Sequence, residues 1–171
     1  MTVFGMPPAI VDHHRPNMDE TDLRDHLEKA LRELVERDAE LFTWNVSERC
    51  IAARLAHYLQ NQIDDLSVDV EYNRVARTPK TLNLPEECAK TLGDNNEPLV
   101  IPDIILHHRG PDGPNLLVIE VKKSTNPCSR NCDRLRLHAF RGQLHYRFGA
   151  LIEFETRREH AAAATVTEWL S

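Results

Sequence analysis

The stretch LLVIEVKKS, residues 116–124, constrains the fold of this 171-residue chain more than any other part of it. Its first four residues are apolar, as in a strand buried inside a sheet, and Glu120 and Lys122 then interrupt the run. Successive side chains of a strand point to opposite faces, so Glu120 and Lys122 share one face and Val121 points to the other. An acid and a base side by side on a core strand predict a polar site at the end of an apolar sheet.

The periodicity of apolar residues predicts the neighbouring elements. A long amphipathic helix is expected over 19–41, with Asp19 or Thr21 as its cap, and Ser47 is a good cap for a second helix. Residues 158–170 could form either a helix or a strand. The other predicted elements are a helix within 45–62, a strand over 67–73, a long insertion over 75–98 with a short helix at 85–92, an apolar strand over 99–108, a helix over 132–146 and a strand over 149–155.

Asp103 lies in the strand predicted to precede LLVIEVKKS. The glycines and prolines of residues 109–115 predict a hairpin between the two strands, and an antiparallel hairpin can bring Asp103 across from residues 120–122. Two carboxylates that converge in a partly buried place repel each other unless a cation joins them. Mg²⁺ suits such oxygen ligands, and a metal-bound water beside Lys122 is what phosphodiester hydrolysis requires.

The residues Pro102–Asp103, followed by Glu120, Val121 and Lys122, resemble the motif of the PD-(D/E)XK nuclease superfamily. The predicted order of elements is also similar to the α-β-β-β-α-β core of that superfamily, over about residues 44–155. The resemblance implies an α/β fold with a restriction-endonuclease-like core, a central mixed sheet of four to five strands flanked by helices. Residues 1–18 are then expected to form a flexible N-terminal arm, and residues 19–171 a single nuclease-like domain.

The resemblance also implies roles for individual residues. Asp103 and Glu120 would ligate Mg²⁺ or Mn²⁺, the Val121 carbonyl would be a further ligand, and Lys122 would be the catalytic lysine. Glu48 stands at the start of the second helix, where this superfamily often directs an acid at the metal. Two plainer explanations are the alternatives: an acid in the first turn of a helix that favours the helix dipole for Glu48, and a structural ion pair for Glu120 with Lys122.

The distribution of charge suggests where a polyanion could bind. The net charge of −6 argues against a general nucleic-acid binder, yet residues 121–149 hold seven Lys and Arg residues against Asp133 alone. Such a local basic surface suits a phosphate backbone, although a solvated helix face is the alternative. The candidate nucleic-acid contacts are Lys123, Arg130, Arg134, Arg141, Gln143 and Tyr146, of which the last two resemble a Gln/Tyr pair in some branches of the superfamily.

The sequence therefore predicts a metal-dependent nuclease that acts on nucleic acid, with DNA as the first choice of substrate. The alternative is a catalytically silent member of the same fold that serves as a nucleic-acid-binding or protein-interaction subunit. A domain of this size has little room for a separate sequence-reading module, so a homodimer or a partner protein is expected.

The expected location of the chain predicts the redox state of its cysteines. No apolar run approaches the roughly 18–20 residues of a membrane span, and the N-terminal residues do not read as a secretory signal, so a cytoplasmic protein is expected. Cytoplasmic cysteines are normally reduced. Free thiols are therefore predicted at Cys50, Cys88, Cys128 and Cys132.

Overall fold

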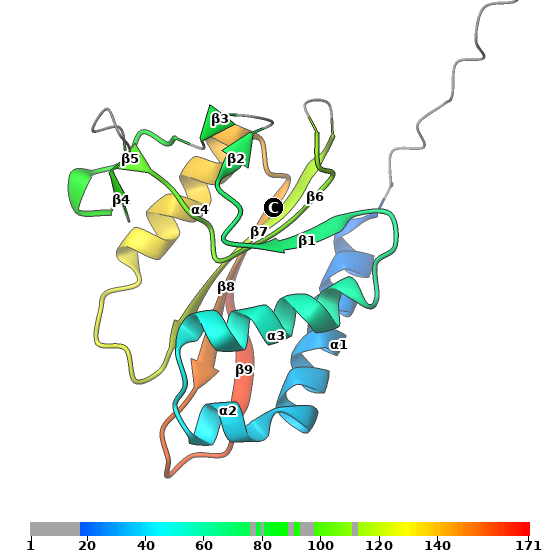
Figure 1. Cartoon of the computed structure of the whole chain (residues 1–171), viewed down its shortest axis with the longest axis vertical. Helices are drawn as coiled ribbons and strands as arrows, with labels where there is room; N and C mark the ends of the chain where they lie inside the picture. The colour runs from blue at the N-terminus through cyan, green and yellow to red at the C-terminus, as the bar shows by residue number, and fades with distance from the viewer. Residues whose placement is uncertain (1–17, 76–77, 80, 89–90, 93–97, 111–112) are drawn as a thin grey trace, which may run out of the picture.

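The computed structural model describes residues 18–75, 78–79, 81–88, 91–92, 98–110 and 113–171, and its centre is a five-stranded mixed sheet (Figure 1). The strands lie side by side in the order β1-β6-β7-β8-β9. All neighbours are antiparallel except β7 and β8, which are parallel. The strands of this sheet are β1 (Ser67–Val70), β6 (Ile104–His107), β7 (Asn115–Lys123), β8 (Phe148–Glu155) and β9 (Ala163–Leu170). The fold is therefore α/β, as predicted.

Helices cover both faces of this sheet (Figure 1). One face carries α1 (Glu20–Arg37), α2 (Ala39–Thr43) and α3 (Glu48–Gln60), and the other carries α4 (Asn131–Leu144). Strand β7 contributes to a separate apolar cluster on each side. Ile119 packs with the residues of α1 and α3, whereas Val118 packs with Leu137 and Phe140 of α4. The alternation predicted for β7 is thus confirmed from Leu117 onward, whereas Leu116, expected on the face of Val118, packs in the cluster of α1 and α3. The alternation decides which helix each polar side chain of the strand meets.

The two predicted helix caps in the N-terminal half are confirmed. The Asp19 carboxylate accepts a hydrogen bond from the Asp22 amide, and the Ser47 hydroxyl accepts one from the Cys50 amide. The helix predicted over 19–41 is interrupted at Asp38, where the short α2 begins. The Asp38 carboxylate accepts hydrogen bonds from Arg54 and Tyr58 of α3. These contacts attach the junction of α1 and α2 to α3.

The strands around the insertion are shorter than predicted. Strand β1 stops at Val70, because Glu71 adopts a positive φ of 53° and leaves the strand. The expected strand over 99–108 becomes two pieces, since β6 begins only after Pro102. Within 75–98 the structure has the 3₁₀ turn η1 (Glu86–Cys88) and two small ladders, formed by β2 (Arg74–Val75) with β3 (Thr78–Pro79) and β4 (Thr91–Leu92) with β5 (Pro98–Leu99). Among the described residues of the helix expected over 85–92, Glu86–Cys88 form that turn and Thr91–Leu92 belong to β4.

The C-terminal segment is a strand, which decides between the two structures left open for 158–170. The expected arm lies almost wholly outside the described residues, which begin at Met18. Within the described part of the chain, no helix has the length and apolar character needed to cross a membrane.

Parallel strands β7 and β8 are joined at their C-terminal ends by side chains. The Ser124 hydroxyl donates to Glu155, and Thr156 donates its amide to the same Ser124 oxygen. Glu155 also accepts from Arg157, with His160 in contact with its second oxygen. The hydrogen bond from Ser124, with help from His160 and Arg157, lowers the pKa of Glu155 to about 2.

Glu155→Gln is expected to destabilise the protein at neutral pH and to matter progressively less in acid. The pKa of Glu155 is lower in the folded chain than its ordinary value of 4.5, so its carboxylate stabilises the fold fully above about pH 4.5 and loses that effect as the pH falls toward 2. Urea midpoints of the two proteins, measured from pH 7 to pH 2, should converge at the acid end. A difference that stays constant over this range would contradict the assignment.

Candidate functional site

The C-terminal half of β7 collects two of the predicted carboxylates along its backbone. Asp103, one residue before β6, accepts a hydrogen bond at Oδ2 from the Val121 amide at 2.9 Å. Glu48, the first residue of α3, accepts at Oε1 from the Lys123 amide at 2.8 Å. Because amides of alternate residues in a strand point the same way, two acids from different elements are attached to one edge of β7. The hairpin prediction that Asp103 lies beside residues 120–122 is confirmed.

Asp103 and Glu48 line a common hollow on the side of the sheet that α3 covers. The other residues of this hollow are Ser47, Arg49, Ala52, Val70 and Glu71. Glu48 also accepts from the side-chain amide of Asn126, and Arg49 donates to Glu71 at 2.7 Å. The first turn of α3 therefore points an acid at the strand end, as predicted, and the hydrogen bonds to Glu48 come from neutral amides.

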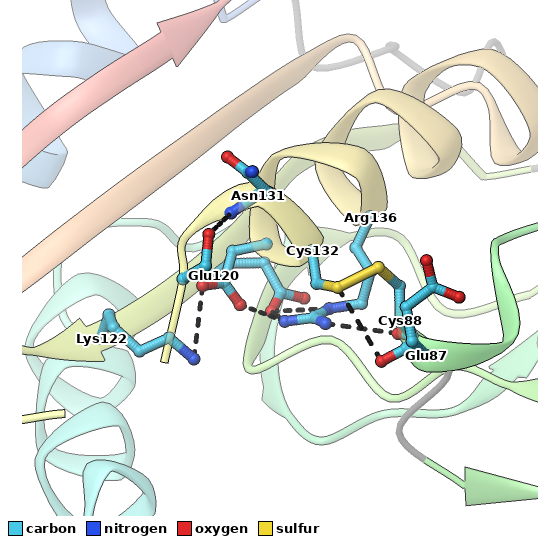
Figure 2. The surroundings of a disulfide bond; sticks show 9 residues. Glu87, Cys88, Glu120, Lys122, Asn131, Cys132 and Arg136 are labelled. Atoms are coloured by element: carbon cyan, nitrogen blue, oxygen red, sulfur yellow. Dashed lines mark hydrogen bonds and ion pairs between the residues drawn. A yellow bond between two sulfur atoms is a disulfide. The ribbon is translucent and has the colours of Figure 1, made fainter. Parts of the chain in front are cut away.

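Glu120 and Lys122 point away from this hollow and toward α4. Glu120 is 0% exposed, and its Oε2 accepts from Arg136 Nε at 3.1 Å and Nη2 at 2.8 Å. Arg136 also donates to Asp133, and Lys122 Nζ lies 3.3 Å from Asp133 Oδ2 (Figure 2). The face of β7 that carries Glu120 and Lys122 thus meets the guanidinium of Arg136 and the carboxylate of Asp133, both from α4.

Glu120, Lys122, Asp133 and Arg136 form a compact set of two negative and two positive charges, which is called the buried charge cluster below. Burial opposes the charged form of Arg136, but the carboxylates of Glu120, Asp133 and Asp103 outweigh it and raise the pKa of Arg136. Paired in this way, the charges can remain in a place from which water is nearly excluded. Because Asp103 is among the carboxylates that raise the pKa of Arg136, its charge acts on the α4 side of the sheet as well.

The sequence analysis missed Asp133 and Arg136 as members of the site. A usable signal was present, because residues 133, 136, 137 and 140 follow the three- and four-residue spacing of a buried helix stripe. Leu137 and Phe140 are the apolar residues of that stripe, and both are fully buried. An acid and a base on the same stripe also face the sheet, where they meet Glu120 and Lys122 of β7.

The predicted metal ligands do not gather in this arrangement. Among the described residues, no three side chains of His, Cys, Asp or Glu are placed together so that they could hold a metal ion. Glu120 is bound by a guanidinium, while Asp103 and Glu48 accept hydrogen bonds from backbone amides. The donor set therefore does not form the oxygen cage of a hard divalent cation as it stands.

Most of the basic side chains predicted to contact nucleic acid have partners in the protein. Arg130 pairs with Glu153 at 2.6 Å, and Arg134 pairs with Glu168. Lys123 Nζ donates to Asn45 and to the Val46 carbonyl. These two acids come from β8 and β9, so Arg130 and Arg134 of the basic run are paired with carboxylates distant in sequence, whereas Lys123 contacts neutral oxygen atoms.

The last three candidates of that set also contact the protein. Gln143 exchanges hydrogen bonds with the backbone of Asn83, and Arg141 donates to the carbonyl of Arg147 at 3.4 Å. Tyr146 is 2% exposed, its ring packs edge-on against Phe140, and burial raises its pKa. Of the Gln/Tyr pair suggested by the resemblance, Gln143 therefore binds the backbone of the insertion, and Tyr146 lies in the apolar core.

The prediction of four reduced cysteines is wrong for two of them. Cys88 and Cys132 form a disulfide across 44 residues of sequence, between η1 and the first turn of α4 (Figure 2). Cys50 and Cys128 are free and exposed. The prediction rested on the expected location of the protein, and sequence spacing gave no sign that η1 packs against α4.

Arg136→Met is expected to lower the free energy of unfolding by about 3–5 kcal/mol, because it leaves Glu120 and Asp133 buried without their shared cation. Arg134→Met is a matched control on the same helix, and its more exposed pair with Glu168 should contribute about 0–1 kcal/mol. Denaturant unfolding at neutral pH measures both values. Equal losses for the two variants would show that the buried charge cluster does not organise this face.

Comparison of the chain with protein-family models, with curated proteins and with solved structures finds no match.

Proposed function

We propose that this protein is a metal-dependent nuclease that hydrolyses phosphodiester bonds of nucleic acid, with DNA as the first substrate to test and Mg²⁺ or Mn²⁺ as the cofactor. The observation that carries the proposal is that two acids from different elements bind the end of the strand that carries the motif. Asp103 and Glu48 accept from the amides of Val121 and Lys123, on the strand segment that bears Glu120 and Lys122.

The order and direction of the elements support a restriction-endonuclease-like core as part of this proposal. The sequence of elements α3, β1, β6, β7, α4, β8 follows the α-β-β-β-α-β order that the motif resemblance implies. The β1, β6 and β7 strands form an antiparallel meander, and α4 then crosses over to place β8 parallel to β7. Within this arrangement the motif residues come from the start of β6 and the end of β7, next to each other in the sheet.

The chain's own residues have definable parts in such a reaction. Lys122 is 14% exposed at its side chain and pairs with Asp133, so its ammonium would have to leave Asp133 before it could contact a phosphate oxygen. Glu120 is deeper and would have to exchange Arg136 for a divalent cation before it could ligate one. The proposal therefore includes a rearrangement in which Arg136 moves away from Glu120.

Cleavage assays test this proposal directly. Plasmid DNA, single-stranded DNA and RNA should be incubated with Mg²⁺, with Mn²⁺ and with EDTA, and cleavage that depends on the divalent cation is expected. Lys122→Ala should lower the rate about 100-fold or more, since it removes a positive group from the reacting phosphate. Lys29→Ala, an exposed lysine of α1, is the control and should leave the rate unchanged.

Lys122→Arg separates catalysis from folding. Arginine can keep the ion pair with Asp133, so the melting temperature should stay near that of the wild type, while the changed shape of the cation should still impair cleavage. Cleavage that persists in both Lys122 variants would remove this residue from the catalytic site, and failure of the wild type on every substrate would refute the nuclease proposal.

A second candidate function, a catalytically silent nucleic-acid-binding or protein-interaction subunit of the same fold, is favoured by one observation. The buried charge cluster satisfies Glu120 and Lys122 with Arg136 and Asp133, as a structural ion-pair network would. A silent nucleic-acid-binding subunit should bind DNA or RNA without cutting it, and its affinity should be insensitive to EDTA and should fall steeply with salt. Filter binding and cleavage measured on the same preparations distinguish the two candidates.

A further inference from the structure

Residues 82–88, called the strap below, lie along α4 and are attached to it at two points. Near one end of the strap, Asn83 donates its amide to Gln143 Oε1 at 2.8 Å and accepts from Gln143 Nε2 at its carbonyl at 3.2 Å. At the other end, Cys88 is joined to Cys132 by the disulfide. Leu82 is buried in the apolar cluster of α4, so the strap closes over one face of that helix.

The disulfide end of the strap also touches Arg136. The carbonyl of Cys88 accepts from Arg136 Nη1 at 3.4 Å, while the other guanidinium nitrogens donate to Glu120 and Asp133 (Figure 2). Cys132 and Arg136 are four residues apart on α4 and therefore lie on the same side of the helix. The bond that fixes Cys88 to Cys132 thus also fixes the carbonyl that helps to hold Arg136 against Glu120.

The two cysteine residues differ in their exposure to solvent. Cys88 is 3% exposed, whereas Cys132 is only half-buried, at the start of α4. Figure 2 shows the disulfide beside the guanidinium, with Cys132 Sγ 3.9 Å from the carbonyl of Glu87. A thiolate that approaches from solvent therefore meets Cys132 first, with Cys88 as the leaving sulfur.

We propose that Cys88–Cys132 is a thiol–disulfide exchange site whose reduction by a small thiol releases the strap from α4 and loosens Arg136 from Glu120. A thiolate attacks Cys132 Sγ, the bond to Cys88 breaks, and Cys88 leaves as a thiolate that takes up a proton. A second thiolate then displaces Cys132 from the mixed disulfide, so that both cysteines end as thiols and two molecules of the small thiol are oxidised to one disulfide.

The consequence for the site follows from the two attachments. With the disulfide intact, the strap is held covalently, and the Cys88 carbonyl stays in position over Arg136. After reduction the strap is retained by non-covalent contacts, among them the Gln143 hydrogen bonds, the packing of Leu82 and Leu84 and the Arg136 contact, and local opening becomes easier. An open strap admits water and cations to Glu120. This last step rests on the proposed function, whereas the release of the strap does not.

Hydrogen exchange of the whole chain tests the release. In a Cys50→Ser/Cys128→Ser background, the only cysteine pair is Cys88 and Cys132. Reduction with dithiothreitol should raise the exchange rate of the strap amides about tenfold or more, including the Cys88 amide that donates to Pro85, and should leave α1 unchanged. Equal exchange in the oxidised and reduced proteins would overturn the proposal.

Two variants sharpen this measurement. Cys88→Ser/Cys132→Ser should exchange like the reduced protein and should no longer respond to dithiothreitol; if it does not fold, the reduced protein itself still gives the answer. Gln143→Ala removes the other attachment. It should change strap exchange severalfold more in the reduced protein than in the oxidised one, because only then is Gln143 a main remaining anchor. An equal effect in both states would contradict the two-point attachment.

Manganese binding, followed by the electron paramagnetic resonance of free Mn²⁺, tests the link to Glu120. Reduction should tighten Mn²⁺ binding about tenfold, and Glu120→Gln should abolish that gain. If exchange rises but Mn²⁺ binding is unchanged, the coupling to Glu120 is refuted. If both change and no nucleic acid is cut under any condition, the nuclease proposal fails and the exchange site stands.

Discussion

The burial of Glu120 is the constraint on which this face of the protein depends. A carboxylate with no exposed surface needs a cation in contact, and Arg136 provides it from α4. The same guanidinium reaches Asp133, which in turn reaches Lys122, so one ion-pair network sets the position of α4 over β7. The strap completes the arrangement, because its Cys88 carbonyl accepts from the remaining guanidinium nitrogen. One side chain, that of Arg136, thus contacts helix, strand and insertion at once.

Much of the fold could be predicted because the signals are local. Asp19 and Ser47 begin their helices as their cap chemistry indicates, and the alternation in β7 predicts its two apolar faces. Predictions were less accurate where tertiary contacts override local pattern. Asp38 breaks a continuous helical periodicity because α3 supplies Arg54 and Tyr58 to its carboxylate. The choice of a strand for 163–170 depends on pairing with β8, which periodicity alone does not reveal.

In the site, too, the feature set by local sequence was predictable and the features set by tertiary contacts were not. The position of Asp103 beside β7 follows from a hairpin, which is encoded in the turn residues between the two strands. The partners of Glu120 and Lys122 come from a crossover helix, and a sequence reading that treats Asp133 and Arg136 as part of a basic run has no means of pairing them with a strand. The Cys88–Cys132 disulfide is harder still to foresee, since an insertion with little regular structure has to pack on α4 before the two sulfurs meet.

Strand β7 therefore separates two groups of acids that a nuclease site would have to unite. On its edge, Asp103 and Glu48 accept from backbone amides, and such neutral donors can be shared with a cation without leaving a buried charge unpaired. On its α4 face, Glu120 is matched by a full positive charge, and a divalent cation can take that place only if Arg136 moves. Whether this strand end can act as a single site then depends on replacement of the Arg136 guanidinium by a divalent cation beside Glu120. It does not depend on further carboxylates. The strap lies where it can control that replacement, because it contacts Arg136 and is itself held to the same helix.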